Sequence, residues 1–173
     1  MGDRNMKNVL VVPSFIMIVT LLIGCTNDKQ SFEQFFNEKM KGESSPHKLI
    51  HNELDIVKQG DAMAIYQFED KVWVSYYKTE DDKWILQQSN GVNCNSPVDW
   101  TSNNGHIFSG MICDDAISEV HVDNQKAEII TVEDKKFWYV ITSQHRDREE
   151  VEVKYTRKDG SEYNCMKRTD EKT

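Results

Sequence analysis

The chain has 173 residues and a formal net charge of −8 at pH 7, with 38% hydrophobic residues. This acidic balance argues against nucleic acid as a partner, because nucleic acids are bound by proteins that neutralise phosphates with basic groups. It argues equally against adhesion to anionic membranes or acidic wall polymers, and it favours a solvated, self-repelling surface.

The first 24 residues have the organisation of an export signal. Arg4 and Lys7 precede an apolar run that extends over residues 9–24. This run is shorter than the roughly 20 apolar residues that a membrane-spanning helix needs, so we expect a secretory signal peptide. The pattern is compatible with translation from either Met1 or Met6.

The end of this segment, Leu22-Ile23-Gly24-Cys25, resembles the lipobox of bacterial lipoproteins, in which a branched and a small residue precede an invariant Cys. By this resemblance, Cys25 receives a diacylglyceryl group and becomes the new N-terminus. Two acyl chains hold a protein firmly at a membrane, whereas a single chain binds marginally. We therefore predict a lipid anchor on the extracytoplasmic face of the cell membrane, followed by a short tether over residues 25–31.

Removal of the signal leaves about 150 residues, a normal size for one domain, which we place at residues 32–173. Besides Cys25, the chain contains Cys94, Cys113 and Cys165, so at most one disulfide forms within it. We favour Cys94–Cys113, because this pair would close the long loop between the two residues. Export makes such a bond permissible.

A short amphipathic helix is expected at the start of the domain. Ser31 and Gln34 have the spacing of a capping box, and four apolar side chains then fall on one helical face over residues 32–41. The helix either docks on the domain or lies on lipid near the anchor.

From Lys48 onward, short β-rich runs alternate with polar turns. In the run 71–78, Val72, Val74 and Tyr76 fall on one face and the intervening residues on the other. Asp159-Gly160 joins the last two runs and is a strong hairpin signal. The runs expected to form strands are 49–57, 62–68, 71–78, 83–89, 106–112, 117–122, 127–132, 137–143, 150–156 and 161–167.

The stretch between the fourth and fifth of these runs, residues 91–105, is rich in Asn and Ser and is interpreted as a long loop. These short strands with tight turns, and no βαβ spacing, indicate an all-β fold, a mainly antiparallel β-sandwich or barrel-like domain.

Four segments, GDAMAIY, SPVDWTS, FSGMICDDAISEV and KKFWYVITS, carry a resemblance to small uncharacterised lipoproteins of Gram-positive, Bacillus-type bacteria. The similarity covers about residues 32–160. It implies a lipid-anchored location and a single β-rich domain, and it brings no activity or functional residues.

The sequence contains no recognisable catalytic motif. A Gly-x-Ser-x-Gly elbow and a phosphate-binding glycine loop are both missing. Five histidines lack a metal-binding spacing such as His-Glu-x-x-His. We therefore predict no catalytic residues, no metal and no cofactor.

The run Phe137-Trp138-Tyr139 must place large rings on both faces of one strand. In a two-sheet sandwich only one face of a strand points inward, so at least one ring needs another cover. Either the N-terminal helix or the long loop provides it, or Trp100 and Trp138 form an exposed binding patch.

Together these features predict a binding or accessory module at the cell envelope, whose partner is an envelope protein or a wall-derived ligand. The alternatives are an envelope hydrolase or redox protein whose site forms only in three dimensions, and a lipoprotein with a purely structural role.

Overall fold

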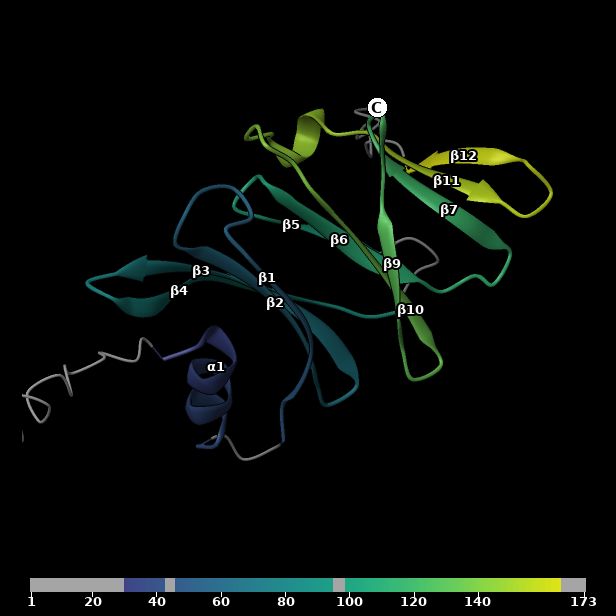
Figure 1. The fold of residues 1–173 in the computed structure, drawn as a ribbon. Helices are drawn as coiled ribbons and strands as arrows, with labels where there is room; N and C mark the ends of the chain where they lie inside the picture. The colour runs from purple at the N-terminus through teal and green to yellow at the C-terminus, as the bar shows by residue number, and fades with distance from the viewer. Residues whose placement is uncertain (1–29, 43–45, 95–98, 166–173) are drawn as a thin grey trace, which may run out of the picture. The chain divides into compact units, whose positions relative to one another are not determined.

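The computed structural model describes residues 30–42, 46–94 and 99–165. Their helices and strands belong to one compact unit that begins at Ser31 (Figure 1). In chain order they are α1 (Phe32–Met40), β1 (Lys48–Leu54), β2 (Asp61–Phe68), β3 (Lys71–Glu80), β4 (Lys83–Val92), β5 (Trp100–Asn103), β6 (Ile107–Ile112), β7 (Ile117–Val122), β8 (Gln125–Lys126), β9 (Glu128–Val132), β10 (Lys135–Ile141), η2 (Arg148–Glu150), β11 (Val153–Arg157) and β12 (Glu162–Cys165).

The strands form three antiparallel sheets of four. Sheet A has the order β1-β2-β3-β4, sheet B the order β5-β6-β10-β9, and sheet C the order β12-β11-β7-β8. The expected mainly antiparallel β fold with one short helix is thereby confirmed. The sheets do not close into a barrel, so the barrel alternative is wrong.

Sheet B has apolar contacts on both faces. Phe137 and Tyr139 of β10 pack against the side chains of β2 and β3 in sheet A. Trp138 and Val140, the alternate residues, pack against β7 and β11 of sheet C. A strand covered on both faces needs a continuous apolar run rather than an alternating one, which explains the sequences of β6 and β10.

The third sheet corrects the expectation for the aromatic run. Trp138 is completely buried, with its ring 6.3 Å from the ring of Tyr155 in β11. Sheet C covers it, and Trp100 of the 91–105 segment packs on the same cluster of side chains. Trp138 therefore belongs to the core, and the prediction that it contributes to an exposed binding patch is wrong.

The helix α1 docks on the face of sheet A that is turned away from sheet B. Its capping box is formed: Gln34 N donates to Ser31 Oγ at 3.2 Å, and Ser31 N donates to Gln34 Oε1 at 3.1 Å. Phe32 and Phe36 are buried, and Phe32 meets the ring of Tyr77 edge-on at 5.2 Å. Of the two positions expected for the helix, docking on the domain is the one observed.

Part of the segment expected to be a long loop is a β-hairpin. Residues 100–103 form β5, which pairs with β6 across the turn Asn104-Gly105. Both turn residues have positive φ, 53° and 65°, and His106 N donates to Asn103 O at 3.2 Å. Asn-Gly is the dipeptide that best accommodates this geometry.

A glycine in β6 creates space for Trp138. Gly110 lies opposite Trp138 in β10 and opposite Trp100 in β5. A Cβ atom at Gly110 would collide with the backbone oxygen of Asp99 and would lie 2.8 Å from the indole Nε1 of Trp138. The absence of a side chain therefore allows the indole ring to extend over β6.

We expect Gly110→Ala to lower the free energy of unfolding by about 1–3 kcal/mol, because the added methyl group overpacks the space that Trp138 fills. Gly42→Ala is the matched control, since a Cβ at Gly42 would have no atom within 4 Å. The control should change stability by less than about 0.5 kcal/mol. Urea unfolding measures both variants, and equal stabilities would contradict this packing.

Candidate functional site

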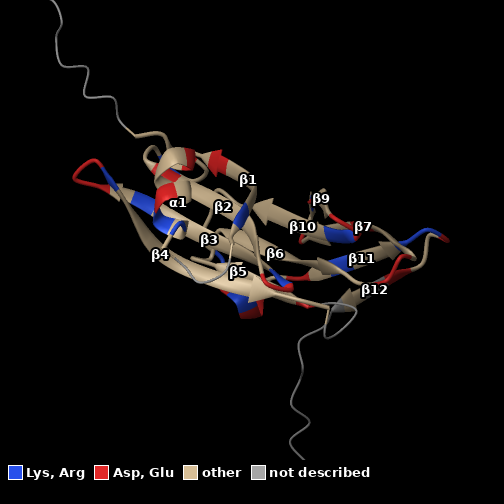
Figure 2. Ribbon diagram, turned by 90° about the horizontal axis from the view of Figure 1, so that it is seen from below, with Lys and Arg blue, Asp and Glu red and all other residues tan. Residues whose placement is uncertain are grey.

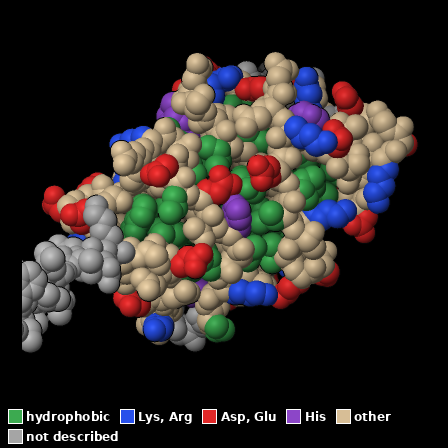
Figure 3. All heavy atoms as spheres, viewed as in Figure 1, with side chains coloured by type: hydrophobic (Ala, Val, Ile, Leu, Met, Phe, Trp, Pro, Cys, Tyr) green, Lys and Arg blue, Asp and Glu red, His purple; other side chains and the backbone are tan. Residues whose placement is uncertain are grey.

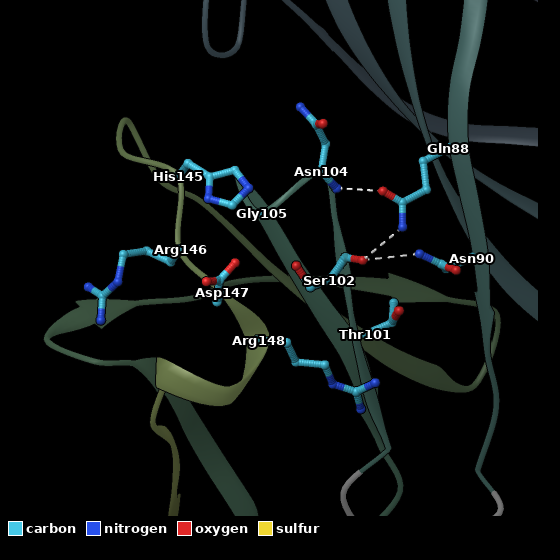
Figure 4. Close-up of a pocket in the computed structure, with 10 residues that line it drawn as sticks. All are labelled: Gln88, Asn90, Thr101, Ser102, Asn104, Gly105, His145, Arg146, Asp147 and Arg148. Carbon is cyan, nitrogen blue, oxygen red and sulfur yellow. Dashed lines mark hydrogen bonds between the residues drawn. The ribbon is translucent and has the colours of Figure 1, made fainter.

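A polar pocket of about 370 Å³ lies at the free edge of β5 (Figure 4). Its walls come from β4, from β5 and its following turn, and from the segment after β10. The lining residues are Gln88, Asn90, Thr101, Ser102, Asn104, Gly105, His145, Arg146, Asp147 and Arg148.

An amide network fixes the strand side of this pocket. The side chain of Asn103 is buried and donates to Val74 O of sheet A at 2.8 Å. Asn90 Nδ2 donates to Asn103 Oδ1 at 2.9 Å and to Ser102 O at 3.1 Å. Gln88 Nε2 donates to Ser102 O at 3.3 Å. These bonds hold β4 of sheet A and β5 of sheet B together where the two sheets meet at this edge.

The opposite wall is the segment after β10, which is tied to the β5–β6 turn. Arg146 N donates to Gly105 O at 2.9 Å. The ring of His145 lies where a Cβ of Gly105 would stand, so no larger residue fits there. His145 also meets the ring of His106 edge-on, with 5.6 Å between centroids.

Arg148 closes the end of the pocket nearest to Trp100. Its Nη2 donates to the Trp100 backbone oxygen at 3.0 Å, and its guanidinium carbon stands 4.6 Å from the centre of the Trp100 ring. The indole is half-buried and packs on Phe108 of the core. Of the two tryptophans predicted to form a binding patch, Trp100 therefore lies beside the pocket under an arginine, whereas Trp138 does not reach it.

Three side chains of the pocket have unused hydrogen-bonding capacity. Within the described part of the chain, the hydroxyls of Thr101 and Ser102 and the carboxylate of Asp147 make no hydrogen bond or ion pair. Figure 4 shows the Ser102 and Asp147 side chains pointing toward each other, whereas Arg146 points away. Arg146 instead pairs with Asp123 at 3.0 Å.

The backbone of β5 adds a donor to this set. Asp99 O accepts from Met111 N of β6. In an antiparallel pair, the backbone groups of successive residues point alternately toward the partner strand and away from it. The backbone groups of Thr101 and Asn103 therefore point toward β6, and those of Trp100 and Ser102 point outward. The two outward carbonyls are capped, by Arg148 and by the Gln88 and Asn90 amides. The Ser102 N–H faces the pocket.

A second hollow, of about 450 Å³, also borders Arg146. Its remaining lining residues belong to the end of β7, the start of β8 and the turn between them, and to the segment that follows β10. The β5 pocket is the stronger candidate, because the amides of Gln88, Asn90 and Asn103 hold its strand wall in place.

Another polar cluster closes the opposite edge between sheets A and B. The hydroxyl of Tyr139 lies 2.6 Å from Glu53 Oε1 of β1 and 2.8 Å from Glu128 Oε2 of β9, so the two carboxylates share its single proton. His51 Nε2 lies 3.0 Å from the same Glu53 oxygen. On the face that Figure 3 shows, acidic side chains and a histidine lie among hydrophobic side chains. The cluster joins the edge strands of two sheets that share no backbone ladder there.

Cys94 and Cys113 are joined by a disulfide, with Cα atoms 5.5 Å apart, which is a usual separation. The bond links the end of β4 in sheet A to the end of β6 in sheet B. This is the pairing that the sequence favoured.

The predicted lipidation site Cys25, its lipobox Leu22, Ile23 and Gly24, and the signal peptide lie outside the described residues. In the described part, no helix is long and apolar enough to cross a membrane. Nor does that part contain three His, Cys, Asp or Glu side chains arranged to hold a metal ion.

Comparisons of this chain with protein-family models, with curated proteins and with solved structures found no match.

The tyrosines of the core predict how stability depends on pH. Burial and the hydrogen bond to Asp61 raise the pKa of Tyr76 to about 12, and burial raises the pKa of Tyr77 to about 12 as well. Burial, together with the bonds to Glu53 and Glu128, raises the pKa of Tyr139 further. The folded protein keeps these phenolic protons, whereas the unfolded chain releases them near pH 10.

We therefore expect these tyrosines to leave the free energy of unfolding unchanged up to about pH 9 and to lower it as the pH rises from about 10 toward 12, since the unfolded state then binds fewer protons. Urea unfolding in alkaline buffers measures this. Tyr139→Phe should cost about 1–3 kcal/mol at neutral pH, because it removes the hydroxyl that bonds to the carboxylates of Glu53 and Glu128. It should also make the alkaline decline shallower. A free energy that does not change through pH 11 would contradict the assignment.

Proposed function

We propose that this protein is a lipid-anchored binding protein of the cell envelope, held on the extracytoplasmic face by Cys25, and that the β5 pocket is its ligand site. The observation that carries the binding role is that the unused hydrogen-bonding groups of Ser102 and Asp147 point toward each other in a pocket that Thr101 also lines (Figure 4).

Several features support the location and the class of partner. The lipobox sequence supports the anchor. The Cys94–Cys113 disulfide supports an extracytoplasmic compartment, because disulfides are rare in the cytosol. Basic side chains are distributed over the outer strands and turns rather than gathered on one face (Figure 2), which supports an envelope protein or a wall-derived ligand over nucleic acid.

The finer description of the fold belongs to the same proposal. We infer a layered β-sandwich, in which sheets A and C cover the two faces of sheet B and α1 covers the far face of sheet A. In this arrangement the edge of sheet B is the part of the central layer that remains accessible to a ligand.

The anchor is tested by Cys25→Ala, which removes the atom that would carry the lipid. We expect this variant to leave the membrane fraction and lose the mass of the diacylglyceryl group, because one unlipidated signal segment does not replace two acyl chains. Cys165→Ser is the matched control and should remain in the membrane fraction. Membrane fractionation and intact mass spectrometry provide the measurement. A Cys25→Ala protein that stays membrane-bound would contradict the anchor.

The binding site is tested by co-sedimentation of the protein with isolated cell-wall material. We expect the double variant Ser102→Ala/Asp147→Asn to bind at least about tenfold more weakly, since each change removes a hydrogen bond to the ligand. Glu149→Gln, an equal loss of charge on an exposed residue two positions along the chain, should bind normally. Both proteins should unfold at the same temperature. Unchanged binding by the double variant would contradict this site.

A further inference from the structure

The pocket combines hydrogen-bond donors and a single strong acceptor. The hydroxyls of Ser102 and Thr101 both donate and accept, the Ser102 N–H donates, and the Asp147 carboxylate only accepts. A complementary ligand must therefore offer donors to Asp147 and acceptors to the β5 backbone within a short distance. Alcohol groups meet both demands at once, because each carries a donor and two acceptor lone pairs.

The charges around the pocket disfavour a ligand that carries a net charge. Arg148 is held at one end by Trp100, and Asp147 contributes the opposite charge. A simple anion would be attracted by Arg148 but repelled by the carboxylate of Asp147. A simple cation would be attracted by Asp147 but repelled by Arg148. Arg146 does not alter this balance, because it points away and is neutralised by Asp123.

The dimensions of the pocket agree with a small ligand that lies along a strand edge. Its volume of about 370 Å³ is at the lower end of the range of roughly 300–1,000 Å³ for small-molecule sites. An added β-strand is a poorer match, because both outward carbonyls of β5 are already capped by side chains. These caps are a device that protects sheet edges from strand addition.

We infer that the β5 pocket binds a neutral, hydroxyl-rich ligand of the saccharide class, with hydroxyl groups donating to Asp147 and accepting from Ser102. This inference rests on the proposed binding function of the same pocket and specifies its ligand. Within this site Asp147 is the acceptor that selects for hydroxyl groups, and the β5 residues orient the sugar ring.

The test is calorimetric titration of the full-length protein in a detergent without a sugar headgroup. The probes are a panel of neutral mono- and disaccharides that includes glucose, N-acetylglucosamine and their disaccharides. Acetate and glycylglycine serve as anionic and zwitterionic comparisons. We expect at least one saccharide to bind, and Asp147→Asn to weaken its affinity roughly tenfold or more, because a charge-assisted acceptor is replaced. Glu149→Gln should bind the same saccharide with unchanged affinity.

Each of the other outcomes overturns the inference. If no saccharide in the panel binds, or if saccharides bind Asp147→Asn as well as the parent protein, this ligand class is wrong. If acetate or glycylglycine binds instead, in a manner that depends on Asp147, the pocket remains a binding site for a charged ligand. Wall binding that persists in the Ser102→Ala/Asp147→Asn variant would reject the proposed site itself.

Discussion

The burial of sheet B on both faces is the constraint on which the rest of the structure depends. Most buried side chains of β6 and β10 are apolar on both faces, and the hydrogen-bonded side-chain networks of this layer lie at its two open edges. Both edges accordingly carry a hydrogen-bonded network. At the β5 edge Asn103 bonds to the backbone of sheet A, and at the β9 edge the Tyr139 hydroxyl meets Glu53 and Glu128. Each network satisfies buried polar atoms and fixes the position of sheet A on sheet B.

The candidate site is a consequence of the first of these networks. Gln88 and Asn90 use their amides to cap Ser102 O, which prevents another chain from extending the sheet and holds β5 in place. The hydrogen bond from Arg146 N to Gly105 O holds the segment after β10 beside the β5–β6 turn, and that segment contains Asp147. The unused groups of Ser102 and Asp147 therefore face a space whose walls are set by the fold rather than by the ligand, as expected for a preorganised site.

Much of the fold can be predicted from sequence because its signals are local. The capping box predicts α1, Asp159-Gly160 predicts the β11–β12 hairpin, and alternation assigns the faces of β3. The third layer was missed, because Phe137-Trp138-Tyr139 does not reveal what covers its second face. The Asn104-Gly105 turn was an available signal for β5, but the polar residues around it favoured a loop. The proximity of Ser102 and Asp147 could not be predicted from sequence, because the two residues are 45 positions apart and only the fold of sheet B brings them together.

Native-state hydrogen exchange, measured strand by strand, tests the central position of sheet B most directly. A layer covered on both faces can exchange its interior amides only through global unfolding. The account predicts that the amides of β6 and β10 are the slowest to exchange and that all share one opening free energy. Those of the edge strands β1 and β12 should exchange faster, through local opening. Amides of β6 and β10 that exchange as fast as those of β1 and β12 would contradict the buried central sheet and, with it, the rigid wall of the proposed site.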